Sequence, residues 1–130
     1  MTTEPNFTIR ELNHVALDVS DVAASVRFYR DVLGLPELPR PDFGFPGAWF
    51  RVGVTQELHL IGHRDRAVGQ RAGHFALLVS DIDGAAARLR AAGTEFRGPK
   101  PRPDGVKQIF LPDPDGNMIE LCDKLVVSNG

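Results

Sequence analysis

The sequence predicts an α+β fold of two tandem modules, each consisting of a strand, a helix and further strands. An internal repeat supports this prediction. The nine residues that begin at His14 and the nine that begin at His74 share six identities. A second match follows at nearly the same spacing, where residues 58–60 correspond to residues 119–121. Because one such half cannot cover its own sheet, we expect the halves to form one curved mixed sheet around a central cavity, with the helices outside.

The first module is predicted at about residues 10–62. The alternating stretch from Ile9 to Val19 predicts a strand that places His14 and Val15 on opposite faces. Ser20 is a good N-cap for the helix that follows, and Gly34 is placed to end it. The buried stripe of this helix is predicted to be Val22, Val26, Tyr29 and Leu33.

The rest of the first module is predicted to be a long loop followed by two strands. Residues 35–47 are rich in Pro and Gly and contain Phe43 and Phe45. Loops of this length in compact domains are often functional. Strands are expected at 48–52 and 57–61, and the second places Glu57 and His59 on one face.

The pattern restarts after a polar linker, residues 62–72, in which we interpret His63 as solvated. The second module, about residues 73–124, begins with a strand at 73–79. Ser80 is the expected N-cap, and Gly93 is the expected stop. The helix stripe between them is predicted to be Ile82, Ala86 and Leu89. A Pro-rich loop at 98–105 precedes strands at 106–111 and 118–122, which the turn at 113–117 joins.

Length and composition indicate a single domain, residues 1–130, of a globular protein in the cytoplasm. A net charge of −2 argues against a nucleic-acid or membrane partner. The single cysteine, Cys122, excludes an intrachain disulfide and fits a reducing compartment. The sequence contains no apolar run of about 18 residues, and the first nine residues lack a signal-peptide pattern.

Ligand-type residues occupy the same face of four predicted strands, opposite the apolar face that each helix covers. They are His14, His59, His74 and Glu120. A lone strand histidine is usually structural, but three of the four histidines fall at these positions. In a pseudo-twofold arrangement the four side chains would converge. Three imidazoles and one carboxylate suit one divalent ion, namely Zn, Ni, Co, Mn or Fe(II).

Four stretches, residues 13–17, 28–35, 73–76 and 113–121, resemble the vicinal oxygen chelate superfamily. This group includes glyoxalase I, methylmalonyl-CoA epimerase, fosfomycin-modifying enzymes, extradiol dioxygenases and bleomycin-resistance binding proteins. The resemblance covers about residues 10–124, and its most specific runs are Phe-Tyr…Leu-Gly-Leu and Asp-Pro-Asp-Gly-Asn…Glu-Leu. It implies paired βαβββ modules whose first strands carry the ligands His14 and His74. The last strand of each module would carry His59 and Glu120, and a glyoxalase typically has a carboxylate where His59 stands.

The resemblance implies a lyase or isomerase whose small oxygenated substrate chelates the metal. Glu120 is the best candidate general base, and Glu57 is the alternative. Residues expected to bind substrate are Trp49, Phe50, Arg51, Lys107 and Gln108. Arg51, Lys107 or Arg102 would hold an anionic substrate.

Two further hypotheses stay open at this point. One is another metalloenzyme of the superfamily, either a thiol transferase or a ring-cleaving dioxygenase. The other is a metal-free protein that sequesters a small molecule such as a drug. The resemblance also implies a homodimer, with the site either within one chain or shared between two.

Overall fold

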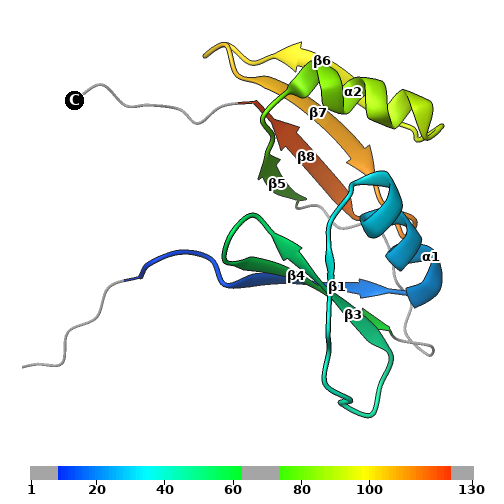
Figure 1. The fold of residues 1–130 in the computed structure, drawn as a ribbon. Coiled ribbons are helices and arrows are strands. Elements are labelled where there is room, and N and C mark those ends of the chain that lie inside the picture. The colour runs from blue at the N-terminus through cyan, green and yellow to red at the C-terminus, as the bar shows by residue number, and fades with distance from the viewer. Residues whose placement is uncertain (1–8, 63–73, 124–130) are drawn as a thin grey trace, which may run out of the picture.

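The structure is a computed structural model that describes residues 9–62 and 74–123, and these ranges form two modules (Figure 1). Module one contains β1 (His14–Val19), α1 (Val22–Arg27), the π-helical turn η1 (Phe28–Val32), β2 (Glu37–Leu38), β3 (Gly47–Val52) and β4 (Gln56–Gly62). Module two contains β5 (His74–Leu78), α2 (Ile82–Ala91), β6 (Arg97–Pro101), β7 (Lys107–Pro112) and β8 (Met118–Cys122). The α+β class and the two tandem modules are confirmed. His63 and the predicted linker beyond Gly62 lie outside the described residues.

The two modules have the same sheet topology. Their strand orders are β1-β4-β3-β2 and β5-β8-β7-β6. In each module the first strand pairs in parallel with the last strand, which pairs antiparallel with the strand before it. As a result β1 and β5 each lie at the edge of a sheet and carry the histidines His14 and His74 at that edge.

Two strands, β2 and β6, lie where the sequence predicts loops. Strand β2 has only two residues, between Pro36 and Pro39, so it carries almost no alternation to detect. Strand β6 contains Pro99 and Pro101. Proline lacks an N–H for pairing and is tolerated only at sheet edges or bulges. Both strands are edge strands, which explains how they form despite an unfavourable sequence.

In both helices the N-cap is the aspartate that follows the predicted serine, so each helix begins one residue later than expected. The Asp21 carboxylate accepts a hydrogen bond from the N–H of Ala24 at 3.1 Å, and Asp81 accepts one from Gly84 at 2.9 Å. A carboxylate at this position also interacts favourably with the helix dipole. The first helix ends as predicted before Gly34, whose φ of 76° is the left-handed conformation that favours glycine. Its last turn widens into η1.

The apolar faces of both sheets contribute to one hydrophobic core, as the alternation predicts. In β1, Leu17 and Val19 are buried, and in β4 Leu58 and Leu60 are buried. The predicted α2 stripe, Ile82, Ala86 and Leu89, is also buried. This core includes residues of both modules. The modules therefore pack through the faces that carry no ligand-type side chains.

Side chains of the β7–β8 turn bind residues at both ends of α1, namely Ser20 before it and Tyr29 in η1. The Tyr29 hydroxyl donates to Asp113 at 2.8 Å in a buried hydrogen bond, and burial together with the Asp113 charge raises the pKa of Tyr29. Asp113 also accepts from the backbone N–H of Asn117 at 2.8 Å. Ser20 donates its hydroxyl to Asp115 at 2.5 Å. The turn predicted at 113–117 is therefore confirmed, and it also joins the modules.

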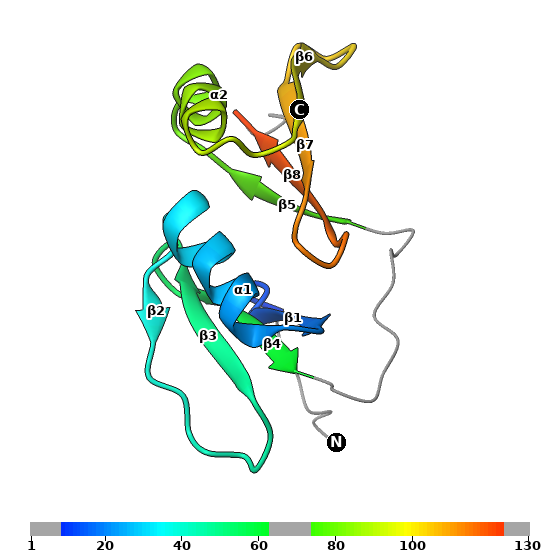
Figure 2. The same ribbon diagram turned by 90° about the vertical axis from the view of Figure 1, so that its right-hand side faces the viewer.

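The single curved sheet that we expected is not formed within the described chain. The eight strands make two separate sheets, and α1 lies on the side of its sheet that faces module two (Figures 1 and 2). The apolar faces turn toward each other because each must be covered, and the opposite faces turn outward. Neither helix in the described ranges has the length and hydropathy of a membrane span.

Candidate metal centre

Strands β1 and β4 bring two of the predicted ligands of module one into contact. They pair in parallel with Ala16 opposite His59, so His14 and His59 share a face. Their imidazole rings stack with centroids 4.2 Å apart and planes inclined by 17°. Trp49, opposite His59 on β3, stacks on its other side at 4.3 Å. The pair is therefore held between its strands and an indole ring.

A neighbouring side chain binds one nitrogen of each imidazole in module one. His59 Nε2 lies 2.8 Å from Glu57 Oε1, and His14 Nδ1 lies 2.8 Å from Asn13 Oδ1. Histidines that bind metals usually donate their second nitrogen to a carboxylate or carbonyl oxygen in this way. The arrangement leaves His59 Nδ1 and His14 Nε2 as the nitrogens that could coordinate an ion.

Glu57 is a supporting carboxylate rather than a free one. Its hydrogen bond with His59 lowers the pKa of the Glu57 carboxyl, partial desolvation opposes this, and the charge of Arg51 lowers it further. The Arg51 guanidinium lies 3.5 Å from Glu57. A carboxyl with a lowered pKa is a weaker base.

In module two the other two predicted ligands also meet. His74 Nε2 lies 3.0 Å from Glu120 Oε1, and Gln108 donates its amide N–H to Glu120 Oε2 at 3.1 Å. Glu120 is buried, with 6% of its surface exposed. A buried carboxylate is costly unless it is paired, and here both of its oxygens have partners.

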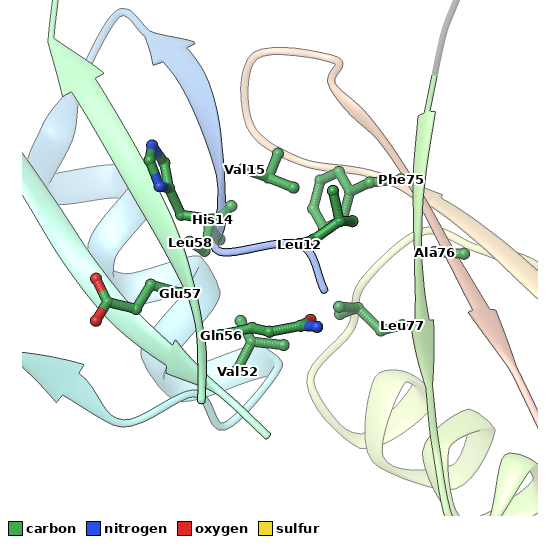
Figure 3. Close-up of a pocket in the computed structure, with 10 residues that line it drawn as sticks. All are labelled: Leu12, His14, Val15, Val52, Gln56, Glu57, Leu58, Phe75, Ala76 and Leu77. Atoms are coloured by element: carbon green, nitrogen blue, oxygen red, sulfur yellow. The ribbon is translucent and has the colours of Figure 1, made fainter. Parts of the chain in front are cut away.

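The two pairs do not converge within one chain. In Figure 3, Phe75 and Leu77 of β5 point toward module one, Phe75 on the side of Val15 and Leu77 on the side of Gln56, whereas Ala76 points the other way. His74 shares the face of Ala76, because the two residues are two positions apart on one strand. Among the described residues no group of three or more His, Cys, Asp or Glu side chains is placed to hold a metal. Of the two arrangements that the sequence leaves open, convergence of all four side chains within the described part of one chain is not seen, because the modules pack through their apolar faces.

The structure separates the predicted substrate-binding residues into two groups. Trp49, Arg51 and Gln108 lie on the ligand faces, beside His59, Glu57 and Glu120 respectively. Phe50 is completely buried in the core, because it alternates with Trp49 along β3. Lys107 alternates onto the apolar face, at the exposed start of β7.

Arg102 does not offer a free charge for an anionic substrate. Its guanidinium binds Asp104 in a paired arrangement, with distances of 3.0 and 2.6 Å. This hydrogen bond lowers the pKa of Asp104 to about 2.

The sequence did not single out Arg40, which lies beside the module-one pair. A hollow of about 200 Å³ opens on this face, lined by His14, His59, Trp49, Arg40, Phe43 and Phe45 among others. The length of the loop and its two phenylalanines predict a functional segment. No local pattern, however, indicates that Arg40 folds back over them.

Comparison with known proteins agrees with the fold. The family described as "Glyoxalase/Bleomycin resistance protein/Dioxygenase superfamily" matches residues 11–121. The chain belongs to this superfamily, and the resemblance inferred from its motifs is confirmed.

Individual relatives are similar over most of their length. A probable lactoylglutathione lyase from Synechocystis is 34% identical over 85% of this chain and 92% of its own. The crystal structure of a putative glyoxalase family protein from Bacillus anthracis superposes with a TM-score of 0.81 at 28% identity, covering 93% of this chain and 100% of its own. TnmS3, an antibiotic binding protein from Streptomyces, superposes with a TM-score of 0.77 at 26% identity, covering 92% and 100%. The superfamily thus includes both enzymes and binding proteins.

Proposed function

We propose that the protein is a metal-dependent lyase or isomerase of glyoxalase type whose active site forms between two chains. The His14–His59 pair of one chain would meet the His74–Glu120 pair of a second copy. One observation carries this proposal. Each module holds two ligand-type side chains in contact on an outward face, and within the described residues the two pairs do not meet.

The sheet edges support an arrangement of two chains. β1 and β5 are edge strands, and an unpaired edge is a ready site for pairing with another strand. Leu78, which shares the face of His74, keeps 56% of its surface exposed at this edge. A twofold dimer would use both edges of both chains and create two equivalent sites.

The donor set fits a divalent ion. Three neutral imidazoles and one carboxylate are ligands that Zn, Ni, Co, Mn and Fe(II) accept, and they leave the site with net positive charge. A bound ion would act as a Lewis acid that stabilises negative charge developing on substrate oxygens.

The side chains of this protein would then have separate roles. Glu120 is our candidate base, because Gln108 holds one of its oxygens and the other is bound only to His74. Glu57 is less suitable because its pKa is lowered. Its role would be to orient His59, as a carboxylate behind a ligating imidazole does. Similarity to lactoylglutathione lyases makes lactoylglutathione chemistry the first activity to assay.

A mixing experiment tests the shared site. His59→Ala and Glu120→Ala each damage one half of every site, so neither homodimer should hold metal tightly. Subunit exchange between the two variants creates mixed dimers in which one site has all four ligands and the other has lost both. At equilibrium about half of the dimers are mixed, so metal content should recover to roughly one ion per four chains.

Recovery also distinguishes the shared site from its alternatives. A site within one chain predicts no recovery on mixing, as does a protein that never binds metal. Mixing His59→Ala with His14→Ala is the matched control, because both changes damage the same half and no combination restores it. Wild type that takes up no metal on titration would overturn the enzymatic proposal.

A second candidate is a binding protein without catalysis. The likeness to TnmS3 and the aromatic lining of the module-one hollow favour it. It predicts ligand binding that is unaffected by a chelator and no turnover with metal present.

A further inference from the structure

A continuous series of aromatic rings leads from the loop before β3 to the candidate ligands. Phe45 stacks on Phe43 at 5.9 Å, and Phe43 lies 5.9 Å from Trp49. Trp49 stacks on His59, which stacks on His14. Phe43 and Phe45 nevertheless remain 52% and 43% exposed. Exposed aromatic side chains gathered at a hollow are a feature of ligand sites.

Arg40 contributes a positive charge to the same hollow. Its guanidinium lies over the rings of Phe43 and Phe45, 5.0 and 4.9 Å from their centroids. It donates one hydrogen bond to the Phe45 carbonyl oxygen at 3.2 Å, and its buried Nε has no acceptor. Within residues 9–62 and 74–123, no carboxylate pairs with Arg40, whereas Arg51 and Arg102 both have acidic partners. A partly buried guanidinium without an anion favours an anionic ligand.

The hollow depends on a glycine that module two lacks. A Cβ at Gly47 would lie 2.9 Å from the Arg40 guanidinium and 2.4 Å from the Leu60 carbonyl oxygen. The equivalent position of module two is Gln108, because Gly47 pairs with Ile61 as Gln108 pairs with Cys122. There the side chain binds Glu120 instead of leaving space. The space beside Arg40 therefore depends on a position that a longer side chain occupies in module two.

We propose that this hollow is a substrate subsite for a flat aromatic group that carries an anionic oxygen. The ring would pack against Phe43 and Trp49, and the anionic oxygen would bind Arg40. This inference rests on the proposed function in one respect, which is that the hollow adjoins the candidate metal ligands His14 and His59. Saturated, cationic or uncharged molecules would satisfy only part of the site.

Three small probes separate the requirement for a flat aromatic ring from the requirement for an anionic oxygen. Benzoate is flat and anionic, cyclohexanecarboxylate is anionic but saturated, and benzamide is flat but uncharged. Trp49 is the only tryptophan in the chain, so its fluorescence reports on this hollow. Each probe is titrated into full-length protein with a chelator present, and calorimetry provides a second measurement. We expect benzoate to bind about tenfold more tightly than either analogue, since it alone meets both requirements.

Two variants test the residues, and a third is their matched control. Arg40→Gln should remove the preference for benzoate over benzamide, and Phe43→Leu should reduce the preference for benzoate over cyclohexanecarboxylate. Arg97→Gln is the control, because Arg97 lies over Phe110 of module two in the same kind of cation–π contact. It should leave all three affinities unchanged. Circular dichroism and thermal unfolding establish that each variant is folded.

Equal affinities for the three probes would overturn the subsite, as would an Arg40→Gln variant that binds benzoate like wild type. These measurements need neither metal nor turnover. If metal uptake fails while the benzoate preference holds, only the proposed enzymatic function is lost. If the mixing experiment succeeds and the benzoate preference is absent, only the subsite is lost.

Discussion

The two modules share a backbone plan but present different chemistry at equivalent positions. Module one has His59 where module two has Glu120, and Trp49 where module two has Phe110. One outward face is therefore aromatic and carries the charge of Arg40, which has no carboxylate partner among the described residues. The other holds a buried carboxylate between an amide and an imidazole. A repeated fold thus presents two outward faces whose side chains are not interchangeable.

On the proposed site, this difference gives the two modules separate roles. Two identical halves would offer two similar pairs of ligands, with no distinction between substrate side and proton-transfer side. Here, on the proposed site, module one would contact the substrate and module two would supply the base. Because the chain turns both faces outward, each active site would combine module one of one chain with module two of another.

The largest expected effect comes from removing the only carboxylate ligand. On the proposed site, Glu120→Gln should weaken metal affinity at least about 100-fold, because a charged ligand in a buried position is replaced by an uncharged amide of the same shape. Competition with a chromophoric chelator measures this affinity. The same variant should abolish any lyase activity.

The matched variant in module one is Glu57→Gln, which removes a carboxylate that supports His59 without being a ligand. Its expected loss is about tenfold, at the lower end for groups that orient a metal ligand. Equal losses for the two variants would contradict the assignment of different roles to the two modules.

The second prediction concerns the contact that fixes the modules against each other. Tyr29→Phe removes the buried hydrogen bond to Asp113 and keeps the packed ring. A hydrogen bond to a charged group contributes about 1.5–3 kcal/mol, so the free energy of unfolding should fall by roughly that amount. Urea denaturation with an unchanged m-value measures it. A change below about 0.5 kcal/mol would mean that this contact does not hold the modules together.

Local patterns in the sequence account for most of each module. Alternation places His14 opposite Val15 and Glu120 between two core residues, because strand periodicity needs only the neighbouring residues. The repeat then identifies the equivalent positions. The edge strands β2 and β6 were missed because proline and short length obscure the same pattern.

The packing of the modules could not be predicted in this way. It depends on contacts such as Tyr29 with Asp113, which are 84 residues apart in the sequence. Both an inward and an outward arrangement of the ligand faces satisfy the alternation of every strand. The position of Arg40 was missed for a related reason, because a loop has no periodicity that fixes a side chain.

A smaller effect is expected from a pair of serines at equivalent positions. The Ser20 hydroxyl donates a hydrogen bond to Asp115 across the module boundary. Within the described residues the Ser80 hydroxyl has no such partner. Ser20→Ala should therefore lower the free energy of unfolding by about 1 kcal/mol, and Ser80→Ala should change it by less than about 0.5 kcal/mol. Thermal and urea unfolding of both variants provide the comparison. Equal effects would indicate that Ser20 acts within its own module.

The smallest effect concerns Glu57, which lies opposite Arg51. The equivalent residue of module two is Met118, which lies opposite Pro112. Nuclear magnetic resonance titration should give a pKa for Glu57 below its usual value, and His59→Gln should raise it, since the hydrogen bond from His59 is the largest cause of the shift. The sign follows from linkage. A carboxyl with a lower pKa in the folded state stabilises the fold above its unfolded pKa, and this contribution disappears as the pH falls through the folded value. A Glu57 pKa that does not change in His59→Gln would mean that Arg51 alone holds the carboxylate. The two modules would then differ in their ligands but not in how those ligands are oriented.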